Sequence, residues 1–186
     1  YQLYLNASNT KASVESYAGV RNRLVLTLPA GIFRVTGTIY IPSYATLVGA
    51  GSQKTIISYT GTGPAIQFID DTSTPLAGVT PANYVSATTS STLYTTQPRN
   101  IAIKGITFVT NSSNQTCIQL DAVRDSVFED ISVEGQYNGI YNANSKGITM
   151  TAVSSLVTCE RNIFSRVKIS GFTFGVYAKE DIKTNT

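Results

Sequence analysis

The sequence predicts an all-β chain that folds as a parallel β-helix, a solenoid in which each coil of the chain stacks on the coil before it. Short apolar runs of about four or five residues alternate with turn residues, which leaves no room for helices between them. Three segments further along the chain repeat one pattern of apolar residues at offsets of 25 and 36 residues. Only 13% of the residues are charged. Coils of this kind bury their apolar faces by stacking.

The first predicted strands lie between residues 24 and 48. They are the apolar, β-branched runs Leu24 to Leu28, Thr38 to Ile41 and Ala45 to Val48. Turn residues follow each run, namely Pro29-Ala30-Gly31, Pro42-Ser43-Tyr44 and Gly49-Ala50-Gly51. Proline at a strand edge argues against a central antiparallel strand, so we expect each run to form one side of a coil. On this stretch alone an ordinary β-sandwich remains an alternative.

Three later segments predict the register of the stacked coils. They begin at Arg99 (RNIAIKGITFVT), Arg124 (RDSVFEDISVEG) and Glu160 (ERNIFSRVKISG). The two offsets align apolar residues that we expect to form two interior stacks: Ile103, Phe128 and Phe164, and Ile106, Ile131 and Val167. Unequal offsets are typical of a solenoid in which extra residues leave the stack as loops.

Charged residues in the same alignment fall into pairs of opposite sign on adjacent coils. The predicted pairs are Lys104 with Glu129, Arg124 with Glu160, and Arg166 with Asp130. Opposite charges on adjacent strands stabilise the pairing modestly. We therefore interpret these acids as members of exposed ion pairs rather than as catalytic groups.

Two loop insertions and one lead-in complete the predicted organisation. Residues 70–98 are rich in threonine, serine and proline with little periodicity, and residues 143–158 account for the longer offset. Both are predicted to leave the coils as loops. The β-helix is thus predicted over residues 24–186, after a lead-in or cap formed by residues 1–23.

The segment VLTLPAGIFRVTGTIYIPSYATLVGAGSQKTII, from Val25 to Ile57, resembles the opening coils of the pectate lyase-like superfamily of right-handed parallel β-helices. Phe33 stands where a tyrosine is usual in that pattern. The resemblance extends over about residues 24–180 and implies a right-handed solenoid. Relatives often place a capping helix before these coils. Here residues 9–22 hold that place and can form a short amphipathic helix, although they lack the Asp-Asp-Thr signature of that cap.

Composition excludes several kinds of site and partner. The chain contains no histidine, so it has no histidine-based catalytic triad, general base or metal ligand. A net charge of +3 is too small to indicate nucleic-acid binding. No apolar run is long enough to span a membrane as a helix. Cys117 and Cys159 lie in apolar surroundings and are predicted to be buried free thiols. We expect no cofactor and no metal site.

Acidic residues offer weak candidates for catalysis. Asp70 and Asp71 stand together at the start of a predicted loop, where they could bind calcium or flank a glycosidic bond. A pair of this kind is more often part of a solvated turn. Asp121, at the end of its strand, aligns with polar or apolar residues, so no stacked acid pair is predicted. We expect no catalytic centre within these residues.

Tyrosines are more suggestive of binding. The offset of 36 aligns Asn138 to Asn142 with Phe174 to Ala178, which places Tyr141 one coil from Tyr177. If Ile140 and Val176 point into the core, alternation along the strands turns both tyrosines outward. Outward aromatic rings in register can stack on sugar rings. A subunit contact or plain packing between strands is the alternative.

The resemblance implies two kinds of function, because the superfamily includes phage tailspikes and tail fibres as well as polysaccharide lyases and hydrolases. Three features favour a virion component. The chain carries little charge, no signal peptide is visible, and its ends look like those of a segment of a longer protein. We expect a tail fibre or tailspike segment, homotrimeric and joined to other tail proteins, that contacts cell-surface polysaccharide. The alternative is an extracellular polysaccharide lyase or glycoside hydrolase.

Overall fold

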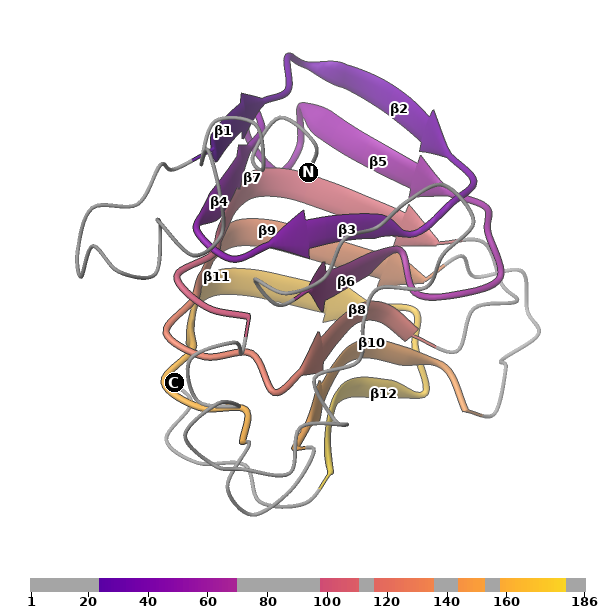
Figure 1. Ribbon diagram of the computed structural model, residues 1–186. Helices are drawn as coiled ribbons and strands as arrows, with labels where there is room; N and C mark the ends of the chain where they lie inside the picture. The colour runs from indigo at the N-terminus through magenta and orange to yellow at the C-terminus, as the bar shows by residue number, and fades with distance from the viewer. Residues whose placement is uncertain (1–23, 70–97, 111–115, 136–143, 153–157, 180–186) are drawn as a thin grey trace.

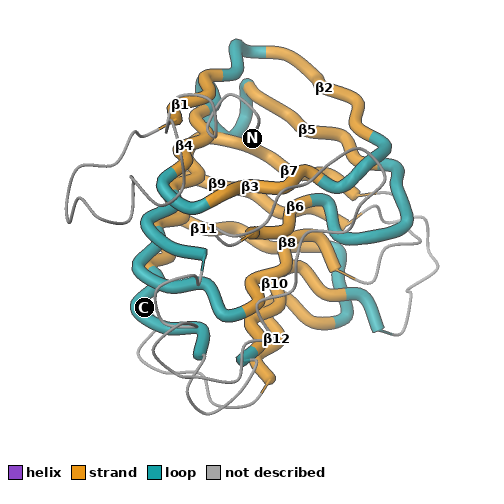
Figure 2. Tube along the Cα trace, viewed as in Figure 1, coloured by secondary structure: helices purple, strands orange, loops and turns teal. Residues whose placement is uncertain are grey.

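The computed structural model describes residues 24–69, 98–110, 116–135, 144–152 and 158–179. Within these residues every regular element is a β-strand and no helix occurs (Figure 2). The predicted lead-in and cap, residues 1–23, lie outside the described residues. The same holds for residues 70–97, which are nearly all of the first predicted insertion.

In the described residues twelve strands form two sheets, and all of their pairs are parallel (Figure 1). Sheet A contains β1 (Leu24–Thr27), β2 (Gly31–Val35), β4 (Ala45–Val48), β5 (Thr55–Tyr59), β7 (Ala102–Thr110), β9 (Val127–Gly135) and β11 (Ile163–Ser170). Sheet B contains β3 (Ile39–Pro42), β6 (Ile66–Ile69), β8 (Thr116–Asp121), β10 (Lys146–Thr151) and β12 (Phe174–Lys179). The chain passes from sheet A to sheet B and back in every coil, so the predicted parallel β-helix is confirmed.

Each coil forms one rung of the solenoid. The first two rungs are β1–β2–β3 and β4–β5–β6, and the next three are β7–β8, β9–β10 and β11–β12. In the later rungs one long strand of sheet A takes the place of two short ones. The pairing shows this, since both β4 and β5 of the second rung pair with β7. Figure 1 shows the rungs stacked in chain order, with β2 at one end and β12 at the other.

The interior stacks have the predicted register. Ile103 pairs with Phe128, and Phe128 pairs with Phe164, at the predicted offsets of 25 and 36 residues. Ile106, Ile131 and Val167 form the second stack. Phe164 and Val167 are only half-buried, because β11 is the last strand of its sheet in the described residues. The two stacks stand three residues apart on each strand, and the left-handed residue between them, Gly105, Asp130 or Arg166, shifts the alternation so that both point inward.

Left-handed backbone marks two bends that recur in successive rungs. The residues with positive φ that share a rung position are Asn100 (54°), Asp125 (52°) and Arg161 (54°), and then Gly105 (64°), Asp130 (51°) and Arg166 (52°). The first group precedes β7, β9 and β11, and the second interrupts those strands near their middle. Positive φ is uncommon for residues other than glycine, so the stacking of these bends holds the backbone in that conformation.

The connection between β4 and β5 crosses the second bend. Gly49 and Gly51 donate backbone hydrogen bonds to the carbonyl oxygens of Lys104 (2.8 Å) and Gly105 (3.1 Å). Beyond them Ser52 Oγ donates to Asp130 Oδ1 at 3.0 Å, and Thr107 Oγ1 donates to the carbonyl of Ser52. The connection therefore ties the second rung to the third and fourth. It fits only because Gly49 and Gly105 carry no side chain where their backbones meet.

The second predicted insertion was wrong in its extent. Residues 146–151, inside the predicted loop 143–158, form β10, which lies between β8 and β12 in sheet B. In this sheet the partner of Val176 is Ile148, and the partner of Tyr177 is Thr149, an offset of 28 residues. The offset of 36 that aligned Tyr141 with Tyr177 therefore holds for sheet A only. Connections of unequal length between the sheets give each sheet its own offsets.

Both cysteines have the predicted environment. Cys117 and Cys159 are fully buried free thiols. Burial raises the pKa of the Cys159 thiol to about 12 and raises the pKa of Cys117 as well, so both stay protonated and unreactive at neutral pH.

The apolar core is open at both ends of the described residues. Leu26 in β1 is 54% exposed and Val176 in β12 is 53% exposed, although alternation directs both inward. A small apolar cavity of about 100 Å³ at the β1 end is lined by Leu26 and by core residues of β3 and β4. These exposed side chains mark the ends of a stack rather than a ligand site.

Candidate functional site

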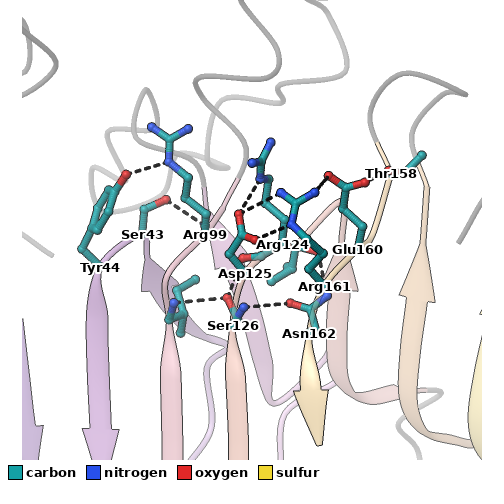
Figure 3. Close-up of polar contacts among 12 residues, drawn as sticks. Ser43, Tyr44, Arg99, Arg124, Asp125, Ser126, Thr158, Glu160, Arg161 and Asn162 are labelled. Carbon is teal, nitrogen blue, oxygen red and sulfur yellow. Dashed lines mark hydrogen bonds and ion pairs between the residues drawn. The ribbon is translucent and has the colours of Figure 1, made fainter. Parts of the chain in front are cut away.

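Two surfaces of the solenoid gather polar side chains, and the first is the corner that precedes β7, β9 and β11 (Figure 3). Arg99, Arg124 and Glu160 stack there in register through isolated parallel bridges. Arg124 Nε donates to Asp125 Oδ2 at 2.8 Å, and Arg161 Nε donates to Asp125 Oδ1 at 2.6 Å. Arg161 Nη1 also donates to Glu160 Oε1 at 2.8 Å. The corner is thus a network of alternating charges.

Polar side chains beneath this network satisfy backbone groups of the same corner. Ser126 Oγ accepts from the backbone N–H of Ile101 at 3.1 Å, and Asn162 Oδ1 accepts from that of Ser126 at 3.2 Å. Asn162 Nδ2 donates to the carbonyl of Val123 at 2.8 Å. Both side chains are fully buried, where an unpaired backbone N–H would be costly. The corner therefore has a structural explanation, which makes it the weaker candidate for a ligand site.

The charge network predicts a pH-dependent contribution to stability. Burial by itself would raise the pKa of Asp125, but hydrogen bonds from Arg161 and Arg124 outweigh it and hold that pKa below its ordinary value of 3.8. A lowered folded-state pKa contributes stability above the unfolded-state pKa, and this contribution is lost as the pH falls through the folded-state pKa.

We expect Asp125→Asn to lower the free energy of unfolding at pH 7, with a difference from wild type that shrinks below about pH 4. Denaturant unfolding at several pH values measures it. Ser132→Ala, which removes an exposed hydrogen bond to Glu134, serves as the control and should show little pH dependence. A difference for Asp125→Asn that grows on acidification would contradict this assignment of the network.

The predicted ion pairs between rungs are confirmed in one case and replaced in the others. Lys104 Nζ lies 3.0 Å from Glu129 Oε2, as expected. Arg166, predicted to pair with Asp130, instead donates to Glu129 at 3.0 Å, whereas Asp130 accepts from Ser52. Arg166 and Asp130 both occupy left-handed positions, which turn their side chains out of the strand alternation. Arg124 and Glu160 stack as predicted, but their ion pairs run to Asp125 and Arg161.

The second polar surface is the outer face of sheet B. One outward-facing residue from each strand falls into a single line across the sheet, and we name this line the outer column: Tyr40, Gln67, Gln119, Thr149 and Tyr177. Inward neighbours such as Ile118 and Ile148 are buried, so strand alternation turns the column away from the core. Tyr40, Gln67, Gln119 and Tyr177 are half-exposed, whereas Thr149 is buried among its neighbours.

Tyr177 is held in place at one end of the outer column. The ring of Phe174 meets the Tyr177 ring edge-on at 5.7 Å between centroids. Lys146 Nζ lies 5.0 Å from the centroid of the same ring and donates to the carbonyl of Asn144 at 3.1 Å. A cation over a tyrosine face is attracted to the ring. These two contacts therefore fix the orientation of the ring.

Asp121 lies beside the middle of the outer column. Its Oδ2 accepts a hydrogen bond from Gln119 Nε2 at 2.5 Å. Burial raises the pKa of this half-buried carboxyl, while hydrogen bonds from Gln119 and Thr151 act in the opposite direction and offset part of the rise. An amide, a carboxyl group and hydroxyls thus stand together on the face that also presents the tyrosines.

The sequence-predicted site residues divide between described and undescribed segments. Tyr177 lies on the outer face of sheet B, and Tyr141, Asp70 and Asp71 lie outside the described residues. The residue next to Tyr177 on the adjacent rung is Thr149, so the predicted neighbour was wrong. Sequence reasoning missed Tyr40, Gln67 and Gln119, although alternation within TIYIP and CIQLD could have turned them outward.

The described residues bring together no group of three or more cysteine, aspartate or glutamate side chains that could hold a metal ion. Nor do they include a helix with the length and apolar character needed to cross a membrane.

Comparison with known proteins places the fold in a family. A family model described as rhamnogalacturonase A/epimerase, pectate lyase-like, matches residues 20–185. None of the curated proteins matches. A solved structure of ORF18 from Geobacillus virus E2 resembles this chain with a TM-score of 0.54 and 15% identity. The likeness covers 94% of this chain and 36% of the viral one, and at that identity it shows the fold alone. Because the family model spans most of the sequence, the chain belongs to the rhamnogalacturonase A/epimerase family of pectate lyase-like proteins.

Proposed function

We propose that this chain is part of a phage-associated adhesion protein that binds cell-surface polysaccharide through the outer column of sheet B. The observation that carries the proposal is the column itself: aromatic and hydrogen-bonding side chains, one from each strand, lie in one line on the outer side of the sheet, and all but the buried Thr149 are half-exposed. Tyrosine rings stack on sugar rings, and amide and hydroxyl groups bond sugar hydroxyls. Binding at this face requires no catalytic group.

The comparisons support the two halves of this proposal separately. The family's description refers to enzymes that act on a polysaccharide, which supports a polysaccharide ligand. The similar fold of a viral protein supports an association with a phage. A place in the virion, on a tail fibre or tailspike, or otherwise outside the cell is part of the proposal. A homotrimer joined to other tail proteins belongs to the same proposal, because long fibres are commonly closed symmetric assemblies. Light scattering on the intact protein measures the number of copies.

Tyr177→Ala tests the proposed site. We expect this variant to bind host-surface polysaccharide roughly 2- to 12-fold more weakly than the wild type, the range of an aromatic contact. Tyr177→Phe keeps the ring and should retain most of the binding. Ser58→Ala, on the outer face of sheet A between buried Ile57 and Tyr59, is the matched control and should bind as the wild type does. Equal binding by wild type and Tyr177→Ala would contradict the proposal.

One observation favours the alternative, a polysaccharide lyase or glycoside hydrolase. Asp121 is half-buried on the proposed binding face with a raised pKa, as a general acid in glycoside hydrolysis requires. Such hydrolysis needs a second carboxylate, and Asp70 and Asp71 stay as weak candidates for it. Polysaccharide shortening that disappears in Asp121→Asn, or in the double change of Asp70 and Asp71 to asparagine, would establish the enzyme. Binding without shortening supports adhesion.

A further inference from the structure

The amide of Gln119 and the carboxyl group of Asp121 form a hydrogen-bonded pair on the outer face of sheet B. They stand two residues apart on β8, so strand alternation places both side chains on that face. Gln119 Nε2 donates to Asp121 Oδ2 at 2.5 Å. From the next strand Thr151, the register partner of Asp121, donates its hydroxyl group to the same carboxyl group. Asp121 therefore accepts hydrogen bonds from its own strand and from the adjacent rung.

An ionised carboxylate fixes which end of the amide faces it. A carboxylate has only acceptor atoms, whereas a glutamine amide has one acceptor oxygen and two N–H donors. Ionised Asp121 thus selects the orientation in which Gln119 Nε2 faces the carboxylate and Oε1 is turned away from it. A hydrogen bond to an ionised acceptor is stronger than a neutral one, so the preference is firm.

Protonation of Asp121 reverses this preference. A protonated carboxyl group carries one O–H donor, and the acceptor that the Gln119 amide offers to it is Oε1. The amide then turns over and directs its N–H groups away from Asp121. Burial raises the pKa of Asp121 above the ordinary value of 3.8, so the reversal occurs at a higher pH than for an exposed aspartate.

Other titratable groups face Asp121 from neighbouring elements of the described residues, namely Lys179, Lys146, Cys159 and Glu160. Lys179 is exposed on β12, two strand spacings or about 10 Å away, where water screens its charge. Lys146 lies over the Tyr177 ring, and Glu160 is held by Arg161. The Cys159 thiol stays protonated at neutral pH. Gln119 thus contacts the carboxyl group directly, while these groups act from further away or on other partners.

Gln67 is an internal control for the pair. It is the register partner of Gln119 on β6 and is half-exposed on the same face. Two residues after Gln119 stands Asp121, but two residues after Gln67 stands Ile69. The two glutamines of the outer column therefore differ in whether an acid follows at the next outward position.

We infer that Asp121 is a positioning residue of the outer column: its carboxylate holds the Gln119 amide so that Oε1 is presented to the ligand, and protonation of Asp121 exchanges this acceptor for N–H donors. The inference rests on the proposed function and adds the polarity and the regulation of the site. At neutral pH the middle of the column accepts a hydrogen bond from a ligand hydroxyl group, and acidification withdraws that acceptor.

Nuclear magnetic resonance of the side-chain amides tests the orientation in the free chain. As the pH falls from about 7 to about 3.5, we expect the Gln119 N–H resonances to shift with a midpoint above 3.8. The Gln67 resonances should shift much less, and in Asp121→Asn the Gln119 resonances should stay constant. Gln119 resonances in the wild type that are as constant as those of Gln67 would overturn the inference.

Binding of host-surface polysaccharide, the probe used for Tyr177→Ala, tests the consequence. We expect the wild type to bind roughly 2- to 12-fold more weakly once Asp121 is protonated, the range of one hydrogen bond. Asp121→Asn should show a loss of this order at pH 7 and little pH dependence. Gln119→Leu combined with Asp121→Asn should bind as Gln119→Leu alone does, because Asp121 acts through Gln119.

Circular dichroism and thermal unfolding verify that each variant is folded. An affinity of Asp121→Asn equal to that of the wild type at every pH, or a further loss in the double variant, would overturn the inference and leave polysaccharide binding intact. No binding by the wild type would instead overturn the proposed function, and the amide resonances would then decide the orientation of Gln119 by themselves.

Discussion

Phe128→Ala should lower the free energy of unfolding by about 3–5 kcal/mol, the cost of deleting a fully buried phenylalanine side chain. Phe128 is fully buried near the start of β9, the second-last strand of sheet A along the described chain. Its ring meets Phe68 of sheet B edge-on at 5.7 Å between centroids and stacks on Phe164 of the next rung at 4.9 Å. The substitution therefore opens a cavity that touches both sheets and two rungs.

Denaturant unfolding of Phe128→Ala beside Ile32→Ala measures this effect. Ile32 is 68% exposed on β2, so its truncation should change the free energy of unfolding by about 0.5 kcal/mol or less. A loss for Phe128→Ala no larger than that for Ile32→Ala would mean that the interior stack does not hold the sheets together.

Gly49→Ala should destabilise the chain by about 3 kcal/mol, near the upper end of what overpacking costs. A Cβ at this position would lie 2.2 Å from the Gly105 carbonyl oxygen and 2.8 Å from the Thr55 Cβ. The oxygen belongs to the backbone bend of β7 and cannot rotate away. Relief would require the connection between β4 and β5 to lift from the third rung, which breaks its hydrogen bonds to Lys104 and Gly105.

Gly37→Ala is the matched control for this prediction. A Cβ at Gly37 would meet no atom within 4 Å, and its φ lies outside the left-handed region. Because alanine restricts the unfolded chain more than glycine does, this variant should be neutral or more stable by about 0.4–1 kcal/mol. Thermal unfolding of both variants gives the comparison. Similar stabilities for Gly49→Ala and Gly37→Ala would contradict the close crossing of the two glycines.

Sheet A could be predicted from the sequence because its long strands repeat one pattern. The apolar positions of β7 recur in β9 at one offset, and those of β9 recur in β11 at another. Ile103, Phe128 and Phe164 were therefore aligned correctly. Sheet B gave no such signal. Its strands are short, and connections of different lengths precede β8, β10 and β12, so the sheet A offset misaligned Tyr177 and hid β10 inside a predicted loop.

The candidate site followed from alternation once the register of sheet B was known. Tyr177 was predicted to face outward, and it does so on β12. Gln67 and Gln119 could not be placed beside each other in advance, because these register partners are offset by 52 positions and the segment 70–97 lies between them. The ion pairs of the corner were missed for another reason. Asp125 and Arg161 adopt positive φ without being glycine, and the residue type at this bend changes from Asn100 to Asp125 to Arg161, so no constant residue marks it.

Hydroxyl-radical footprinting of the chain with and without saturating host-surface polysaccharide tests most directly whether the outer column is the binding face. Tyr40 and Tyr177 are half-exposed at the two ends of the column, and Val25 and Ile32 are exposed on sheet A. Binding at sheet B predicts that polysaccharide slows the oxidation of both tyrosines and leaves Val25 and Ile32 unchanged. Protection of Val25 and Ile32, with Tyr40 and Tyr177 oxidised as fast as in the free chain, would contradict the account.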